Sequence, residues 1–547
     1  MEWIRHCQKN HEECKPPSLK VSNLKVIDCD TRTIVPLPQG TPYATLSYVW
    51  GTSDETGCDL GNELTFCIPQ GFEDAILSAT KIGLRYLWID RYCIDQTSAD
   101  KHRQIQQMDQ IFSSAAITLI HAHGRNPHNS LPGVGSNFRR NAHHMSIMGR
   151  NLVLVPDPPS DIAHTIWSSR AWTFQETYLS KRTLVFTQSQ LYFQCMAEHR
   201  CETIWPALEN TDSLVPTSRH AIPSNTWYNS CALCMQAFEP TRTDDFLPPF
   251  LTFKVFLSQY LGRDLSFPSD LLNAFMGFLH HLWKQDPPMY HLWGICFQAA
   301  LAKTTREGIP KSFDFVEQLL WSPVKRSGSG PLIKIHGIPS WTWSAWNGLS
   351  DCHWPSRSWR ENRWADTFDL HVRVEDQSGQ ILTISQYIEL MSRSFNMYNF
   401  HPHLLISGWI AMVNLYSAPF RPRYYVNGCD RAEAFDVSGT VQLFDVEVMD
   451  VQLPDDPEWD FACLYSDTWP VLLFVPKGEE PQDLVNVSGL TLKPVVAGSQ
   501  VYQRVGVLEE AEFQPMTLDA ERGGRLRKAH WESGLAVDCE WRSIKLV

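Results

Sequence analysis

Two side chains suited to chemistry on a sugar stand four residues apart, at Trp172 and Glu176. The small polar segment before them, Ser168–Arg170, is typical of the start of a helix. Residues four apart on a helix share one face, so the indole and the carboxylate are expected to line one pocket. A flat aromatic wall beside a lone carboxylate suits the sugar-like cation that forms when a glycosidic bond breaks. The pair therefore indicates a pocket for such a cation.

Further polar and glycine residues follow two predicted strands. The first strand ends in Trp50-Gly51, where a glycine lets the backbone approach a ligand closely. The second strand ends at Asp90, and Arg170 offers a natural anchor for a phosphate. Ligands of open parallel sheets bind outside the carboxyl ends of the strands. We therefore expect a ligand-binding set of Tyr48, Trp50, Gly51, Asp90, Asp95, Gln96, Arg170 and Trp172.

Each of these residues also has a purely structural interpretation. Glu176 suits a cap or a salt bridge on its own helix, and Trp172 suits the core. Asp90 and Asp95 suit loops in which a carboxylate accepts backbone amides, and two carboxylates also suit a divalent cation. Arg170 suits a brace at the sheet edge. The residue types alone leave both sets of roles open.

Four possible zinc ligands lie near the start of the chain, at His6, Cys7, His11 and Cys14. Their spacing fits no common zinc finger well. We therefore expect a small helical hairpin with unligated thiols, and no metal site. Cys93 has no identifiable histidine partner, so we expect it to be a small buried residue and not a nucleophile.

The segment from residue 43 to residue 195 alternates strand-like and helix-like patterns. Helical spacing of apolar residues predicts one helix over Phe72–Ile82 and another that begins at Asp100. Such alternation is typical of a parallel sheet covered by helices. The predicted strands are 43–51, 86–90, 117–120, Leu152–Val155 as a fourth, and two more within Thr183–Cys195.

The rest of the chain changes character twice. From Pro206 to about Ser322 the pattern is mostly helical, including Phe250–Leu261 and Leu271–Trp283. Beyond Trp341 it consists of short strand-like runs separated by turns that contain proline or glycine. A chain of 547 residues is too long for a single core. We expect a lead segment at 1–40, an α/β domain at 41–205, a helical region at 206–325 and a β-rich region at 326–547.

Composition narrows the possible partners and the location. The net charge of −13 argues against a general nucleic-acid binder, which needs a concentrated basic face. No run of about 18 uncharged apolar residues is present, so we expect no membrane span. The 15 cysteines are odd in number and scattered, and Met1–His6 lacks the apolar segment of a signal peptide. We therefore expect a reduced, cytoplasmic setting.

Five segments, in this order, resemble the fungal heterokaryon-incompatibility (HET) domain. They are YATLSYVWG, LWIDRYCIDQ, QIQQMDQIFSSA, LPGVGSNFR and SRAWTFQETYLSKRTLVF. The resemblance is densest from Tyr43 to Cys195, and it extends more loosely to WIRHCQKNHEEC, IPSWTWSAW and YQRVG. It implies a fungal protein of non-self recognition and programmed cell death.

HET domains in turn resemble TIR domains, whose fold is a flavodoxin-like parallel sheet. Many TIR domains cleave NAD with a glutamate that follows a tryptophan by four positions, a spacing that Trp172 and Glu176 reproduce. The resemblance therefore implies Glu176 as the catalytic residue, with NAD or a related nucleotide as substrate and no cofactor. The alternative is a non-enzymatic signalling module that self-associates or recruits an incompatibility partner protein.

Overall fold

A computed structural model of the chain forms two compact units. Unit 1 comprises Met1–Leu247 and Arg263–His280, and unit 2 comprises Pro248–Gly262 and His281–Val547. The predicted boundary at residue 205 falls outside the described residues, and the one at 325 coincides with the end of a strand. The structure describes residues 1–21, 23–51, 68–95, 101–139, 144–148, 150–153, 158–197, 199–202, 249–298, 315–326, 332–354, 370–393, 397–417, 424–427, 440–443, 467–474, 485–496, 499–518, 526–531 and 536–547.

An eight-stranded sheet in the order β10-β9-β8-β5-β3-β4-β1-β2 forms the centre of unit 1. Its four inner strands are parallel, because β3 pairs in parallel with β4 and β5, and β5 with β8. The outer strands are antiparallel. The predicted parallel sheet is thus confirmed, as the core of a mixed sheet. The bounds are β1 Lys25–Asp28, β2 Thr33–Pro36, β3 Tyr43–Ser47, β4 Tyr86–Trp88, β5 Ile117–His121, β8 Arg182–Phe186, β9 Leu191–Cys195 and β10 His199–Cys201.

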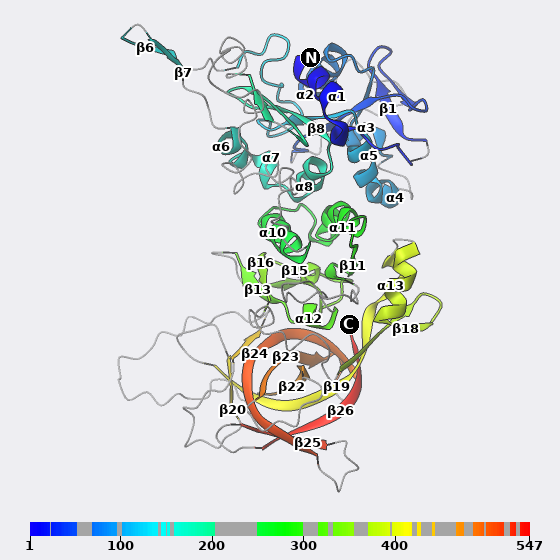
Figure 1. Ribbon diagram of the computed structural model, residues 1–547, viewed down its shortest axis with the longest axis vertical. Helices are drawn as coiled ribbons and strands as arrows, with labels where there is room; N and C mark the ends of the chain where they lie inside the picture. Colours follow the sequence, from blue (N-terminus) through cyan, green and yellow to red (C-terminus); the bar gives the residue numbers. More distant parts are fainter. Residues whose placement is uncertain are drawn as a thin grey trace. The chain divides into compact units, whose positions relative to one another are not determined.

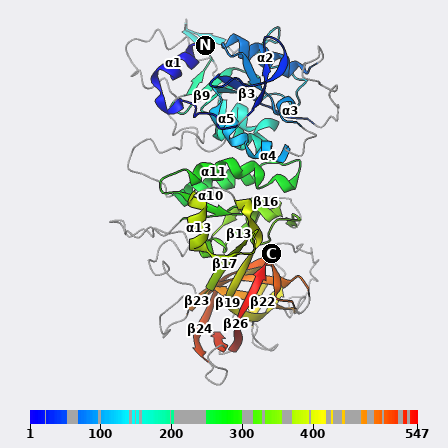
Figure 2. The ribbon, with the colours of Figure 1, turned by 90° about the vertical axis from the view of Figure 1, so that its right-hand side faces the viewer.

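The parallel core has the strand order of a flavodoxin-like fold. Numbered along the chain, its strands lie in the spatial order 2-1-3-4, which is the order of the doubly wound flavodoxin class without its fifth strand. Every residue of β3, β5 and β8 is buried, as expected for strands covered on both faces. Figures 1 and 2 show α2 on one side of this sheet and α5 and α8 on the other.

Helices connect the strands of unit 1 much as the sequence predicted. The helix expected over Phe72–Ile82 is α2, and the helix expected from Asp100 is broken at Gln107 into α4 and α5. The bounds are α1 Glu2–Asn10, η1 Glu12–Cys14, α2 Gln70–Lys81, α3 Asp90–Cys93, α4 Lys101–Gln106, α5 Met108–Ser114, α6 Pro158–Ala163, α7 Ile166–Ser169, α8 Ala171–Tyr178, η5 Pro268–Asp270 and η6 Asn273–Phe275.

One predicted strand lies elsewhere. Leu152–Val155 was expected to be the fourth strand of the sheet, but among the described residues β7 (Arg150–Val153) pairs with β6 (His144–Ile147) alone, as a separate hairpin. Met148 at its turn has a positive φ of 50°. A short apolar run predicts extended backbone but not the strand with which it pairs. The fourth parallel strand is β8.

Unit 2 is rich in strands, as predicted. Among the described residues its largest sheet has ten strands and is built around the long strands β19 and β24, and it includes short strands such as β21 and β22. Of the predicted helices, α10 (Pro249–Leu261) belongs to unit 2, whereas α11 (Met276–Trp283) begins in unit 1 and ends in unit 2. The other bounds are β11 Met289–Leu292, β12 Ile295–Gln298, α12 Phe315–Gln318, β13 Ser322–Lys325, β14 Ile333–Lys334, η7 Trp343–Ala345, β15 Trp346–Asn347, β16 Leu349–His353, β17 Leu370–Asp376, β18 Ile381–Thr383, α13 Ile384–Arg393, η9 Met397–Asn399, β19 Phe400–Ser417, β20 Tyr424–Asn427, β21 Thr440–Leu443, β22 Asp467–Phe474, β23 Val485–Pro494, β24 Val501–Leu518, β25 Leu526–Trp531 and β26 Ala536–Leu546.

The sequence motifs IPSWTWSAW and YQRVG meet in the core of unit 2. Trp341, Trp343 and Trp346 are fully buried, and the indole of Trp346 donates to the Ser340 carbonyl at 2.9 Å. Arg504 of the second motif is also fully buried, and its backbone N–H donates to the Ser340 hydroxyl at 2.8 Å. These two segments, far apart in the sequence, therefore form one packed core.

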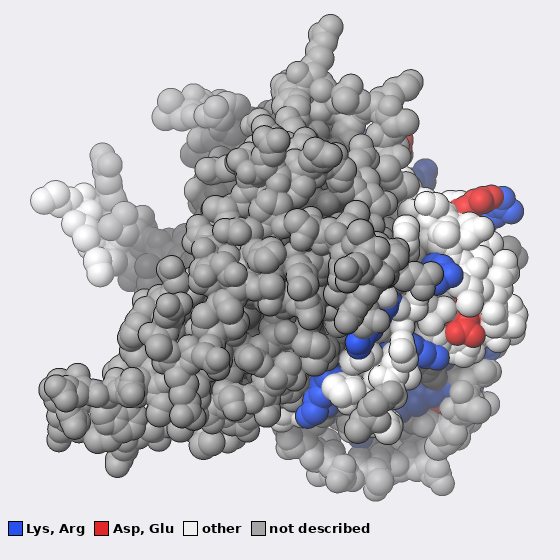
Figure 3. All heavy atoms as spheres, turned by 90° about the horizontal axis from the view of Figure 1, so that it is seen from below, with Lys and Arg blue, Asp and Glu red and all other residues white. Residues whose placement is uncertain are grey.

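No helix among the described residues is long and apolar enough to cross a membrane. On the face drawn in Figure 3, the described part carries both Lys or Arg and Asp or Glu side chains. The two signs of charge are thus mixed on that part of the face.

Candidate functional site

The carboxyl end of β3 lies at the topological switch point of the sheet. Among the parallel strands, β3 comes first along the chain, and it lies between the second strand, β4, and the third, β5. Ligands of doubly wound sheets bind at this point, outside the strand ends. Ser47 ends β3, and Tyr48 and Trp50 follow it. The predicted ligand-binding residues of the first loop thus lie where the topology favours a site.

Asp90 connects this loop with the end of the neighbouring strand. It begins α3, two residues after β4 ends at Trp88. Tyr48 Oη donates to Asp90 Oδ1 at 2.9 Å, and Trp50 Nε1 donates to Asp90 Oδ2 at 2.7 Å. Burial raises the pKa of Asp90, and the hydrogen bonds from Trp50 and Tyr48 oppose that rise. The carboxylate therefore holds two aromatic side chains in fixed orientations.

Glu176 lies on α8 and is only 7% exposed. Burial raises its pKa to about 7, and the negative charge of Asp90 adds to the rise. A hydrogen bond with the Ser47 side chain and the positive charge of Arg170 act in the opposite direction. Glu176 is thus a buried carboxyl group poised between its two protonation states near neutral pH, as acid–base and electrostatic catalysis require.

Sequence reasoning missed two residues that position Glu176, namely Ser47 and Trp167. The buried Trp167 donates its indole N–H to Ser47 Oγ at 2.8 Å, and Ser47 in turn contacts Glu176. Tyr43, Thr45 and Ser47 alternate along β3 onto one face of the sheet, because successive strand residues point to opposite sides. That alternation was the available signal for Ser47, whereas no local pattern marks Trp167.

Replacement of Ser47 by alanine is expected to lower the free energy of unfolding by about 1–2 kcal/mol, since the buried Trp167 N–H loses its acceptor. The same change removes a hydrogen bond that lowers the pKa of Glu176, so that pKa is expected to rise further. Urea unfolding at several pH values measures both effects. Ser169→Ala is the control, because it removes an exposed hydrogen bond from the serine hydroxyl to the carbonyl of Ile166 in the same helix. An unchanged pH dependence in Ser47→Ala would argue against the Ser47–Glu176 contact.

Arg170 lies at the start of α8, with its charge near Glu176 and Asp90. Its carbonyl accepts from Thr173 Oγ1 at 2.8 Å and from Arg263 Nη1 at 3.2 Å. The backbone after Arg170 is also fixed, because Ala171 N donates to the carbonyl of Asp264 at 2.9 Å. Nothing in the sequence indicated this contact, since the two residues are far apart along the chain. The positive charge of Arg170 lowers the pKa of both carboxyl groups. Its use as a phosphate anchor stays a prediction.

The remaining predicted residues lie differently. Trp172 is partly buried and packs against the hydrophobic core of unit 1. Gly51 has φ +80°, and a Cβ there would lie 2.8 Å from the Cβ of Asn126, so the group that approaches this glycine closely is Asn126. Asp95 is exposed just beyond α3, and Gln96 lies outside the described residues. The structure thus brings together Tyr48, Trp50, Asp90, Arg170 and Glu176.

A cavity of about 550 Å³ lies elsewhere in unit 1, and it contains none of the predicted site residues. It is lined by Arg32, Gln70, Glu73, Asp74, Ile76, Leu77, Thr80, His128, Ser130, Gly135, Ser136 and Asn137. Volume alone does not indicate chemistry. The cluster around Glu176 is the better candidate, because it combines a raised carboxyl pKa, a charge partner and the switch point of the sheet.

These features define a doubly wound α/β domain with the buried Glu176 and the partly buried Asp90 at its switch point. Residues 43–176 match the family model described as Heterokaryon incompatibility protein (HET). The chain therefore carries a HET domain, which confirms the resemblance and supports a function in heterokaryon incompatibility. The match begins at the first residue of β3 and ends at Glu176. No curated protein and no solved structure matches the chain.

Proposed function

We propose that the HET domain cleaves NAD or a related dinucleotide at its N-glycosidic bond, with Glu176 as the catalytic residue, as part of a cell-death response. The observation that carries this proposal is the placement of Glu176. It is a buried carboxyl group with a pKa near 7, beside Asp90 and Ser47 at the carboxyl end of a parallel strand. Perturbed carboxyl groups in such positions are typical of catalytic sites.

Cleavage of the N-glycosidic bond between nicotinamide and ribose requires the site to stabilise a positive charge. When nicotinamide leaves, its ring nitrogen loses the positive charge and the ribose becomes an oxocarbenium ion. Ionised Glu176 stabilises that cation through its charge or through the ribose hydroxyl groups. Arg170 attracts the diphosphate, and Tyr48 and Trp50, held by Asp90, offer surfaces on which a ring can stack. Water, or the adenine ring of the same dinucleotide, then captures the cation. Capture by water forms the new C–O bond, releases one proton to solvent and gives ADP-ribose.

Nicotinamide release from NAD by the purified full-length protein is the test. Glu176→Gln keeps the size of the side chain but cannot become negative, so the rate is expected to fall at least about 100-fold. Glu73→Gln on α2 is the matched control, and it is expected to keep the wild-type rate. Because the ionised form is the active one, kcat/KM is expected to rise with pH around a midpoint near 7. Equal activity in Glu176→Gln refutes the catalytic assignment, even if NAD is consumed.

A specific observation favours a second candidate, a non-enzymatic signalling module. Glu176 is 7% exposed and Trp172 packs against the core, so both also serve as packing residues. In this alternative the α/β domain self-associates or recruits an incompatibility partner protein. Absence of nicotinamide release from a concentrated, assembled sample, together with assembly that Glu176→Gln leaves unchanged, supports this alternative.

A further inference from the structure

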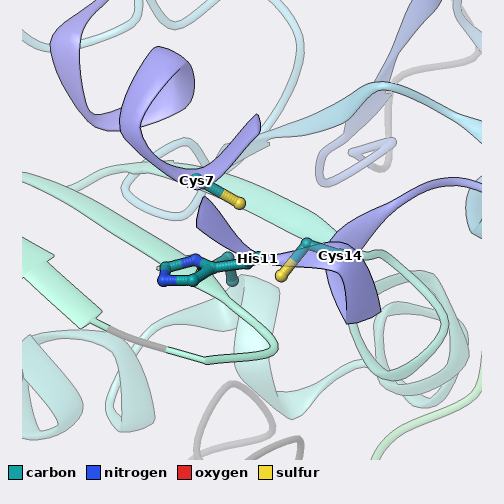
Figure 4. A group of neighbouring side chains, drawn as sticks. Cys7, His11 and Cys14 are labelled. Atoms are coloured by element: carbon teal, nitrogen blue, oxygen red, sulfur yellow. The ribbon is translucent and has the colours of Figure 1, made fainter. Parts of the chain in front are cut away.

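Four metal-binding side chains converge where the N-terminal segment meets the sheet of unit 1. They are Cys7 on α1, His11 between α1 and η1, Cys14 in η1, and Cys195 at the end of β9. Their four possible ligand atoms all lie within 4.8 Å of one another. Figure 4 shows the side chains of Cys7, His11 and Cys14 close to one another. This group is called the Cys3His cluster below.

The dimensions of the Cys3His cluster fit a tetrahedral zinc ion. Zinc lies about 2.3 Å from sulfur and about 2.0 Å from imidazole nitrogen, which sets the separations between ligand atoms at about 3.5–3.8 Å. Cys195 Sγ lies 3.5 Å from His11 Nδ1, and the remaining separations are at most 4.8 Å. Small rotations of the side chains therefore complete the shell. We propose that the Cys3His cluster binds one zinc ion.

The surroundings of the cluster match the charge of such a site. Three thiolates and one neutral imidazole around a divalent ion leave one net negative charge. Arg182 on β8 faces this charge, because its Nε donates to Cys7 Sγ at 3.0 Å. Its Nη1 donates to the Ala116 carbonyl at 3.2 Å, which fixes the guanidinium in place. A cation that donates to a ligating sulfur orients that ligand and stabilises its deprotonated form.

The role of the zinc ion is structural. Four protein ligands fill a tetrahedral shell and leave no position for a substrate or a reactive water. The three cysteines are buried, so the ion lies inside the protein. It joins α1 to β9, next to a contact between the rings of Trp3 and Phe193 at 6.1 Å between centroids. Zinc thereby anchors the N-terminal segment to β9, the strand next to the edge strand β10, whatever reaction the HET domain performs.

The pattern in the sequence was incomplete, which is why it suggested unligated thiols. Cys7, His11 and Cys14 supply three ligands, but the fourth lies 184 residues from His11. His6, the fourth candidate near the start of the chain, is exposed and lies outside the cluster, with its ring centroid 5.7 Å from that of His11. His6 therefore provides a matched control for His11.

Zinc content of the full-length protein, purified in the presence of zinc and a reductant, tests the proposal. We expect about one zinc ion per chain by elemental analysis. Cys195→Ser and His11→Ala are expected to lower it to less than about one tenth, because loss of a ligand weakens binding strongly. His6→Ala and Cys93→Ser, which change residues outside the cluster, are expected to keep it. Substitution with cobalt is expected to give the visible absorption of a tetrahedral thiolate complex.

A further variant separates loss of zinc from loss of the fold. His11→Cys replaces one zinc ligand by another, so it is expected to retain about one zinc ion and to change the cobalt spectrum toward four sulfur ligands. The proposal is overturned if wild-type protein contains no zinc after exposure to it. It is also overturned if Cys195→Ser binds as much zinc as wild type, or if two of the three cysteines form a disulfide in the zinc-treated protein. None of these measurements depends on NAD cleavage.

Discussion

Glu176→Gln is expected to stabilise the folded protein at pH 8 by about 3 kcal/mol relative to wild type. Folding raises the pKa of Glu176 from 4.5 to about 7, because burial penalises the charged form. Glutamine has a similar shape and can accept the Ser47 hydrogen bond, but it carries no charge. The variant thus removes the cost of an ionised carboxylate in a buried position. Few single substitutions of polar residues are expected to stabilise a protein this much.

The sign of this effect depends on pH. A carboxyl group whose pKa is raised by folding contributes its full stability below the unfolded value of 4.5, and the contribution is lost as the pH rises through about 7. Glu176→Gln and wild type are therefore expected to have similar stability near pH 4.5 and to diverge up to about pH 8. Urea unfolding across this range measures the difference. Glu12→Gln, which changes an exposed carboxylate, is the control and is expected to show no such divergence.

A gain in stability at alkaline pH also bears on function. A protein that keeps a destabilising charge in a buried position does so most often where the charge is used. If Glu176→Gln is both more stable and unable to release nicotinamide, the same carboxylate lowers stability and is required for activity. A variant that is destabilised at all pH values would indicate that Glu176 is ionised and well paired in the folded state, which contradicts its raised pKa.

The parallel core of the sheet could be predicted because its signals are local. β3, β4 and β5 are short apolar runs bounded by polar or glycine residues, and helical spacing marks α2 between them. The antiparallel strands at the edges were harder to place, because pairing partners are not encoded in any one segment. The hairpin β6–β7 shows this limit, since its apolar residues predicted a strand but not its partner.

In the candidate site, too, the residues with local signals could be predicted and those defined by distant contacts could not. Asp90 and Glu176 follow directly from residue type and position at strand and helix ends. Their neighbours do not, because Ser47 and Trp167 are 120 residues apart and the hydrogen bond between them exists only in the folded chain. The Cys3His cluster likewise needs Cys195 from a strand remote from the other ligands. When the sequence allows a residue either a structural or a functional role, its contacts with distant residues determine which role it has.

Arg504→Ala is expected to lower the free energy of unfolding of the full-length protein by about 4 kcal/mol. Arg504 is fully buried, with its guanidinium 4.4 Å from the ring centroid of Trp321. Its Nη1 donates to the Leu319 carbonyl at 2.7 Å, and its Nη2 donates to the Trp321 carbonyl. Alanine leaves these carbonyls without their donors and opens a cavity beside Trp341.

Two further variants separate the hydrogen bonds from the packing. Arg504→Met restores most of the volume without the donors, so its loss of stability is expected to be intermediate between wild type and Arg504→Ala. Arg393→Ala, which removes an exposed guanidinium paired with Glu389, is the control and is expected to change stability little. Urea unfolding followed by tryptophan fluorescence measures all three. If Arg504→Met were as stable as wild type, the carbonyls would be satisfied without Arg504, and this residue would contribute volume alone to the core formed by the two motifs.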